Sequence, residues 1–155
     1  MLHSIRRREE VRARFPWIAG ALALVALGCG APETSATGAQ GTFPEAPYAT
    51  LMTESGTLAL AVRTAPAQPP PRGEIAVEYT LATPAGAPRD GLDLTVAPWM
   101  PEMGHGASVE PVVEAVGEGR YRISNLLLYM PGRWELRTTI AGNEDDHVIV
   151  DLEVR

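Results

Sequence analysis

The sequence predicts an all-β protein whose strands pack as a β-sandwich. Three observations support this prediction. Apolar and polar residues alternate in short runs, Gly and Pro interrupt these runs about every ten residues, and no stretch keeps a helical period. Residues 51–155 carry the pattern, and a chain of this length is typical of a single sandwich core.

Seven strands are expected, each with apolar side chains at every second position so that one face is buried. They cover residues 58–62, 75–81, 92–96, 109–116, 121–128, 134–140 and 148–154. Residues that favour turns separate them, beginning with four prolines between Pro66 and Pro71. Seven short strands with these spacings favour a seven-stranded immunoglobulin-like β-sandwich over a barrel.

Residues 1–28 have the composition of a signal peptide. Five arginines precede an apolar run over residues 15–27, which is shorter than the ~20 apolar residues that a membrane-spanning helix needs. Cys29 follows Ala26-Leu27-Gly28 and resembles the lipobox cysteine of bacterial lipoproteins, although Ala26 stands where leucine is usual. We therefore expect lipidation at Cys29; simple cleavage and a retained helical anchor are the alternatives.

Lipidation would make the protein a membrane-anchored, extracytoplasmic lipoprotein, on the periplasmic side or at the outer membrane. It would also leave no free thiol for a disulfide, a zinc site or nucleophilic catalysis. Residues 29–50 are rich in Gly, Ala, Pro and Thr and predict a disordered, flexible tether to the domain at 51–155. Without residues 1–28, eight basic and seventeen acidic residues remain, a net charge of −9 that disfavours binding to nucleic acid.

Met100, Met103 and His105 lie within six residues of one loop, and Met130 lies in a second loop. Thioether sulfur suits Cu(I) and imidazole suits copper in general, so the pattern indicates a copper site. If successive strands alternate in direction, the third and fifth strands end at the same end of the sandwich, and the two loops can converge there. By the same reasoning His147 lies at the opposite end as a surface residue, beside a solvated turn at Asp145 and Asp146.

Three motifs in order carry a family resemblance. Residues 100–106 read Met-Pro-Glu-Met-Gly-His-Gly, residues 117–121 read Gly-Glu-Gly-Arg-Tyr, and residues 130–134 read Met-Pro-Gly-Arg-Trp. Together they resemble the YtkA-like domain, which is related to FixH-like envelope proteins, over about residues 56–154. The resemblance implies a small β-sandwich that is secreted, lipidated or membrane-anchored. It also implies an association with copper or with cytochrome oxidase maturation, and so an envelope copper-handling or oxidase-assembly protein as partner.

Each candidate ligand also has a purely structural interpretation. Met100 and Met130 adjoin prolines and can plug the end of the sandwich, because methionine fills irregular apolar gaps. Trp99 can shield a site or be a core or rim aromatic, whereas Trp134 sits in a regular strand pattern and is expected in the core. For His105, the glycines on either side indicate an unusual backbone path and an exposed imidazole.

The sequence contains no nucleophile with a supporting base and no phosphate-binding glycine loop. It also contains no metal motif of closely spaced Cys and His residues, and we therefore expect no enzyme activity. The leading hypothesis is a lipid-anchored domain that sequesters or hands over Cu(I). Met100, Met103 and His105 would hold the ion, with Met130 as a fourth ligand. The alternative is a metal-free scaffold module of the cell envelope, whose Met-rich end docks a partner protein.

Overall fold

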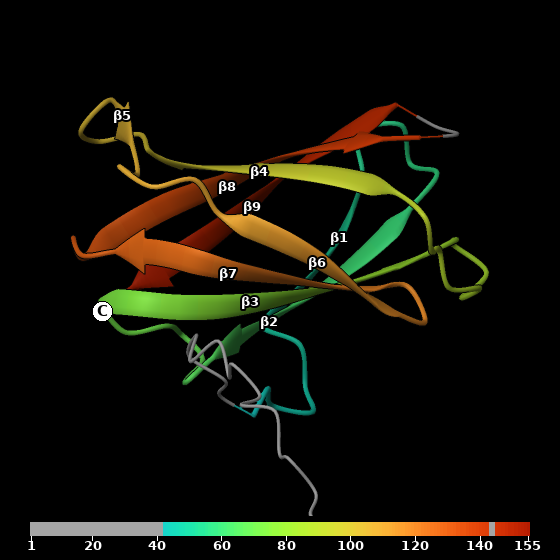
Figure 1. The fold of residues 1–155 in the computed structure, drawn as a ribbon, viewed down its shortest axis with the longest axis horizontal. Helices are drawn as coiled ribbons and strands as arrows, with labels where there is room; N and C mark the ends of the chain where they lie inside the picture. The colour runs from blue at the N-terminus through green and yellow to red at the C-terminus, as the bar shows by residue number, and fades with distance from the viewer. Residues whose placement is uncertain (1–41, 143–144) are drawn as a thin grey trace, which may run out of the picture. The chain divides into compact units, whose positions relative to one another are not determined.

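A computed structural model describes residues 42–142 and 145–155, and these residues form two packed β-sheets (Figure 1). The expected signal peptide, Cys29 and most of the expected tether lie outside the described residues. The strands, in chain order, are β1 (Ala49–Met52), β2 (Ala59–Ala65), β3 (Gly73–Ala82), β4 (Asp93–Met100), β5 (His105–Gly106), β6 (Val112–Gly117), β7 (Arg120–Leu128), β8 (Gly132–Ala141) and β9 (Asp146–Val154). In this part of the chain, no helix is long and apolar enough to span a bilayer.

The seven expected strands are all present, as β2, β3, β4, β6, β7, β8 and β9, and the two short strands β1 and β5 add to them. The all-β sandwich is therefore confirmed. One sheet has the order β1-β2-β3-β7-β6 and the other has the order β5-β4-β8-β9, with antiparallel pairing between neighbours in both.

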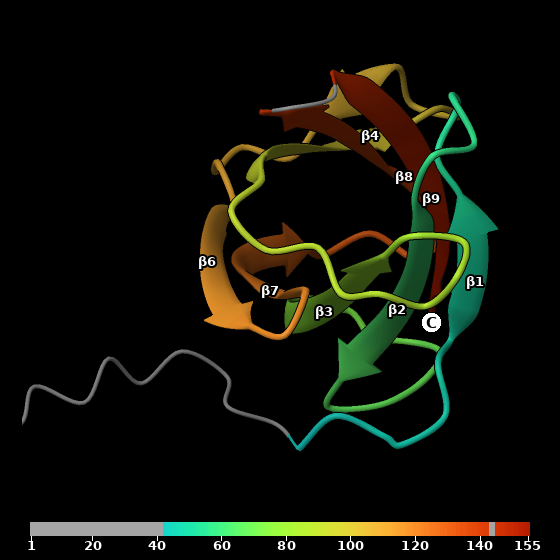
Figure 2. The same ribbon diagram turned by 90° about the vertical axis from the view of Figure 1, so that its right-hand side faces the viewer.

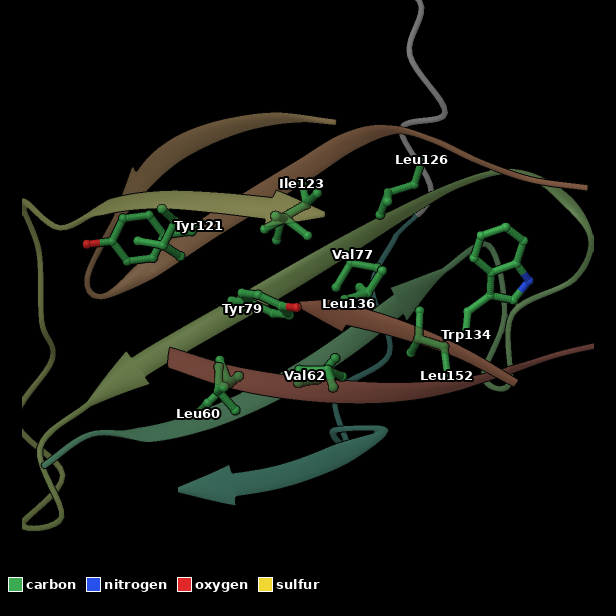
Figure 3. Packing of buried hydrophobic residues seen from close by; sticks show 14 of the residues in the cluster. Leu60, Val62, Val77, Tyr79, Tyr121, Ile123, Leu126, Trp134, Leu136 and Leu152 are labelled. Atoms are coloured by element: carbon green, nitrogen blue, oxygen red, sulfur yellow. The ribbon is translucent and has the colours of Figure 1, made fainter. Parts of the chain in front are cut away.

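The core consists of the inward-facing side chains of both sheets, which the period-two alternation supplies (Figure 3). In β9 the alternation is complete, since every even-numbered residue from Asp146 to Val154 is buried and every odd-numbered one is exposed. Trp134 is 2% exposed, as the sequence predicts. Moving one aliphatic side chain from water into such a core contributes on the order of 2 kcal/mol to the free energy of folding. The core is therefore the main stabilising element of the domain.

The β4–β5 hairpin and the β7–β8 turn lie at one end of the sandwich, which we call the hairpin end. The β1–β2 and β8–β9 turns and His147 lie at the other, which we call the opposite end. These ends follow from the antiparallel order, since β4 and β7 both run toward the hairpin end, where β8 begins.

The two lateral sides of the sandwich differ (Figure 2). On one side β1 lies beside β9, and Glu153 N donates to the Tyr48 hydroxyl at 3.1 Å while Glu54 N donates to His147 O at 2.9 Å. On the other side β4, which β5 covers only at Trp99 and Met100, faces the edge strand β6, and a groove lies between them. One side is thus closed by hydrogen bonds between the sheets, and the other side is open.

Residues before position 51, the expected domain boundary, already pair with the sandwich. Tyr48 N donates to Val62 O at 2.7 Å, and β1 pairs with β2 from Ala49 onward. Upstream, Glu45 O accepts from the Arg63 guanidinium at 3.2 Å, and the Arg122 guanidinium lies 5.7 Å from the centre of the Phe43 ring. The last residues of the expected tether therefore run across the outer face of the β1-β2-β3-β7-β6 sheet.

Candidate functional site

The two loops that carry the candidate ligands meet at the hairpin end. A Cβ atom built on Gly132, in the first position of β8, would lie 3.3 Å from Met100 Cε and 3.8 Å from Glu102 Oε2. The β4–β5 hairpin therefore packs directly against the β7–β8 turn. The expectation that these two connections lie at the same end of the sandwich is confirmed.

Local chemistry explains the shape of the hairpin. Its tip is residues 101–104, and the N–H groups of Met103 and Gly104 donate to Met100 O at 3.2 and 2.9 Å. Gly104 has φ +68°, a left-handed conformation that disfavours residues with a Cβ. At Gly106 a Cβ would lie only 2.9 Å from Pro98 O, so β5 can approach β4 closely only with glycine at that position.

His105 is exposed, and its ring is oriented by its own strand. Nδ1 lies 2.9 Å from Gly106 O, and because a carbonyl oxygen only accepts, Nδ1 carries the proton in this hydrogen bond. In the neutral imidazole the unprotonated nitrogen is then Nε2, which is the state required of a metal ligand. The exposed imidazole expected from the flanking glycines is thus found.

His105 is also the cross-strand partner of Met100. Opposite residues of an antiparallel pair project to the same face with Cβ atoms about 5 Å apart, so the imidazole and the Met100 side chain lie on one face of the hairpin. The register thus brings together two residues that are five positions apart in the sequence. The tip of the hairpin adds Met103, which is 58% exposed.

The methionines differ in burial. Met100 is 4% exposed and belongs to the hydrophobic core, and Met130 is partly buried and packs against that core. Both residues therefore fill the end of the sandwich, as their structural interpretation predicts. Met103 is the one of these three whose side chain is open to solvent.

The two tryptophans near the site make contacts that position the neighbouring strands and turn. Trp134 Nε1 donates to Met130 O at 3.0 Å, which fixes the β7–β8 turn to the start of β8. Trp99 lies at the rim and not in the core, and the Arg137 guanidinium stacks on its ring at 4.7 Å from the centroid. The contact of Trp134 is with the backbone oxygen of Met130 and not with its thioether sulfur.

The electrostatics of the hairpin end are dominated by acid–arginine pairs. Arg133 Nε donates to Asp151 Oδ1 at 2.9 Å, and this hydrogen bond and the charge of Asp151 raise the pKa of Arg133. Glu135 and Glu102 add smaller contributions in the same direction. Glu102 on the hairpin tip thus acts on Arg133, the second residue of β8, which makes a second link between the two loops.

Within residues 42–142 and 145–155, no three His, Cys, Asp or Glu side chains form a group that could hold a metal ion. A metal ion bound at the hairpin end would therefore need thioether sulfur as well as the imidazole. Such a donor set fits a soft cation and not Mg²⁺ or Ca²⁺, which prefer oxygen.

At the opposite end, His147 is a surface residue as expected, with a side chain that is 65% exposed and in contact with the Glu54 carboxylate. Asp145 is exposed, but the expectation of a solvated turn is wrong for Asp146, which is 4% exposed. Its carboxylate accepts hydrogen bonds from Ser55 Oγ at 2.5 Å, from Ser55 N at 3.1 Å and from His147 N at 2.8 Å. Asp146 thereby joins the β1–β2 turn to β9.

The pKa of Asp146 reflects this environment. Burial alone raises the pKa of a carboxyl group, but hydrogen bonds from the Ser55 and Thr53 side chains and from the Ser55 and His147 amides outweigh it. The net result is a lowered pKa. The alternation of β9 could have revealed this residue, since Asp146 lies an even number of positions from Val148 and Val150 and so faces inward with them.

A comparison of the chain with models of protein families matches the model described as YtkA-like over residues 54–139, which is more than half of the sequence. Neither the search of curated proteins nor the search of solved structures found a match. The matched range runs from the β1–β2 turn into β8 and contains the β4–β5 hairpin and the β7–β8 turn. The sandwich fold and the match together establish that the chain belongs to the YtkA-like family.

Proposed function

We propose that this YtkA-like protein is a lipid-anchored, extracytoplasmic domain that binds Cu(I) at the hairpin end and sequesters the ion or hands it over. The observation that carries the proposal is the pairing of His105 with Met100 across the β4–β5 ladder, with the Nδ1 proton of His105 already engaged by Gly106 O. This leaves Nε2 as the coordinating nitrogen, on the same face as a thioether.

Met103 and His105 are the accessible members of the donor set, because both are exposed on one two-stranded hairpin. Met100 lies beneath them and would coordinate only from the rim of the hydrophobic core. Met130 would approach from the neighbouring β7–β8 turn. A set of neutral thioethers with one imidazole suits Cu(I). Exposed ligands also permit transfer by ligand exchange, which fits a carrier better than a permanent store.

The test is an anaerobic Cu(I) titration of the purified protein against a competing chromophoric chelator. Met103→Leu and His105→Ala should each weaken Cu(I) binding at least tenfold. Matched controls come from the opposite end, where Met52 is 49% exposed and the side chain of His147 is 65% exposed. Met52→Leu and His147→Ala should leave the affinity unchanged. Equal affinity in wild type, Met103→Leu and His105→Ala would reject the proposed site.

Membrane attachment through Cys29 forms part of the same proposal. Metabolic labelling with a fatty acid analogue should mark the wild-type protein in the membrane fraction. Cys29→Ser should abolish the label and release the domain. If Cys29→Ser keeps the protein in the membrane fraction, a retained helical segment anchors it instead.

One observation favours the alternative function, a metal-free scaffold module that docks an envelope partner. Tyr129, in the β7–β8 turn, is 67% exposed, so the hairpin end presents an exposed aromatic residue as well as Met103. If Tyr129→Ser and Met103→Ser both abolish a function in cells while the purified protein binds no Cu(I), the docking function replaces the copper function.

A further inference from the structure

The open lateral side of the sandwich contains a groove of about 470 Å³ between β4 and the edge strand β6. Residues of β4, of the segment that leaves β5 and of the start of β6 line it. They are Leu94, Thr95, Val96, Ala97, Pro98, Trp99, Gly106, Ala107, Val109, Glu110, Pro111 and Val113. The groove is mostly apolar, and it lies beside the proposed metal hairpin without including its candidate ligands.

The wall formed by β4 is an incompletely paired strand edge. On its outer side β4 pairs with β5 only at Trp99 and Met100, and Ala107 N donates to Pro98 O at 3.3 Å. Along the rest of this edge, from Asp93 to Ala97, the described residues provide no partner strand. A free strand edge of this kind is a template for an added strand.

The position of Pro98 indicates which backbone groups are available. Its carbonyl faces the open side, because it accepts from Ala107 there, and backbone groups alternate in direction along a strand. The N–H and C=O groups of Val96 and Leu94 therefore face the same side as Pro98 O. Pro98 itself has no N–H to leave unpaired, which is why proline is tolerated in edge strands.

Chemistry limits what can occupy the groove. Val109, which lines the groove, is 37% exposed, so an occupant with apolar side chains at alternate positions would cover surface that is now in contact with water. Glu110 is the one charged residue among the lining residues, and it is an acid. An acidic segment is therefore disfavoured, and basic flanking residues are favoured.

We propose that an extended segment of a partner protein, with β-branched apolar residues at alternate positions and basic flanks, adds to β4 as an antiparallel strand in this groove. The short strand β5 already pairs with Trp99 and Met100, the last two residues of β4, and the added segment continues its line along Val96 and Leu94. Such strand addition takes affinity from backbone hydrogen bonds and specificity from the alternate side chains. The proposal is independent of copper binding, since it uses none of the four candidate ligands.

The experiment uses a synthetic peptide, acetyl-Arg-Thr-Val-Thr-Val-Thr-Arg-amide, titrated into the ¹⁵N-labelled protein and followed by NMR. The amide signals of Leu94 and Val96 should shift and their hydrogen exchange should slow. A peptide with the same side chains, N-methylated at the two adjacent central amides so that each edge of the strand loses a donor, should bind at least tenfold more weakly. Equal binding of the two peptides, or no shift at millimolar peptide, would overturn the proposal.

Val109→Arg and Val116→Arg form a matched pair of variants, since both valines are 37% exposed and only Val109 lines the groove. Val109→Arg should weaken peptide binding at least tenfold, and Val116→Arg should leave it unchanged. The opposite ranking, or equal loss in both variants, would contradict the assignment to this groove. If the Leu94 and Val96 signals shift with protein concentration in the absence of peptide, the edge pairs with a second copy of this chain and the proposed occupant is wrong.

Discussion

The Tyr79 hydroxyl lies 3.2 Å from Thr138 Oγ1 in the centre of the sandwich, and this hydrogen bond joins β3 of one sheet to β8 of the other. Tyr79 is fully buried and Thr138 is 1% exposed. Burial raises the pKa of Tyr79, and the hydrogen bond from Thr138 only partly opposes that effect. A buried polar pair in an apolar core is tolerated because each hydroxyl satisfies the other.

Tyr79→Phe should lower the free energy of unfolding by about 1 kcal/mol, because it leaves the Thr138 hydroxyl without its cross-sheet partner. Urea denaturation of wild type and variant measures the difference. Tyr129→Phe is the control, since Tyr129 is exposed and should show no change. In a double-mutant cycle with Thr138→Val, a coupling energy near zero would show that the pair does not stabilise the fold.

Acid should destabilise the domain through Asp146. Because the folded-state pKa of Asp146 is lowered, its stabilisation is fully present above the ordinary value of 3.8 and is lost as the pH falls below it. Asp146→Asn should cost about 1.5 kcal/mol at neutral pH through weaker hydrogen bonds to Ser55 and His147. Thermal unfolding between pH 2 and pH 6 checks both effects.

The variant should also lose less stability than wild type over that pH range, since it lacks the titrating carboxylate. Asp145→Asn serves as the control, because Asp145 is exposed and adjacent in sequence. A wild type and an Asp146→Asn variant with parallel pH profiles would exclude Asp146 as the source of the acid sensitivity.

Gly119→Ala should be strongly destabilising, by more than ~2 kcal/mol, because it combines a positive φ with a severe overlap. Gly119 has φ +71°, and a Cβ there would lie 2.3 Å from Leu81 O. Gly117→Ala separates the two causes, since Gly117 has φ +88° but no atom within 4 Å of its Cβ position. It should cost only about 1 kcal/mol for the backbone conformation. Equal losses in chemical denaturation would show that the close approach to Leu81 has no effect.

Gly106→Ala should displace β5 from β4, since the new methyl group would lie 2.9 Å from Pro98 O. We expect a stability loss of about 1 kcal/mol from overpacking, together with a change in the position of His105. NMR shifts of the His105 and Met103 amides measure the displacement, and the Cu(I) titration should show weaker binding. Unchanged affinity despite a displaced hairpin would argue against His105 as a ligand.

The strand positions were predictable because a half-buried strand has a period of two that a single sequence displays. The seven expected strands match β2, β3, β4, β6, β7, β8 and β9, and Trp134 faces the core as its position in the pattern indicates. The short strands β1 and β5 were not predicted. Four and two residues are too few to show an alternation, and both depend on a neighbouring strand for their hydrogen bonds.

The convergence of the two methionine-bearing loops was also predictable, because strand direction alternates in an antiparallel sandwich and so assigns each connection to an end. The degree of burial at those loops was not. Met100 and Met103 have the same chemistry in the sequence, but Met100 is 4% exposed and Met103 is 58% exposed. The difference arises because Met100 ends β4 at an inward position whereas Met103 lies at the tip of the hairpin.

Local information in the chain thus specified which residues form strands, which faces those strands bury and which ends the loops occupy. Contacts between residues distant in sequence determined the burial of particular side chains and the position of the groove. The buried carboxylate of Asp146 is satisfied by Ser55, and the groove exists because β4, which β5 covers only in part, and β6 belong to different sheets. These relationships require two sheets to be placed against each other, and no period within one strand encodes that placement.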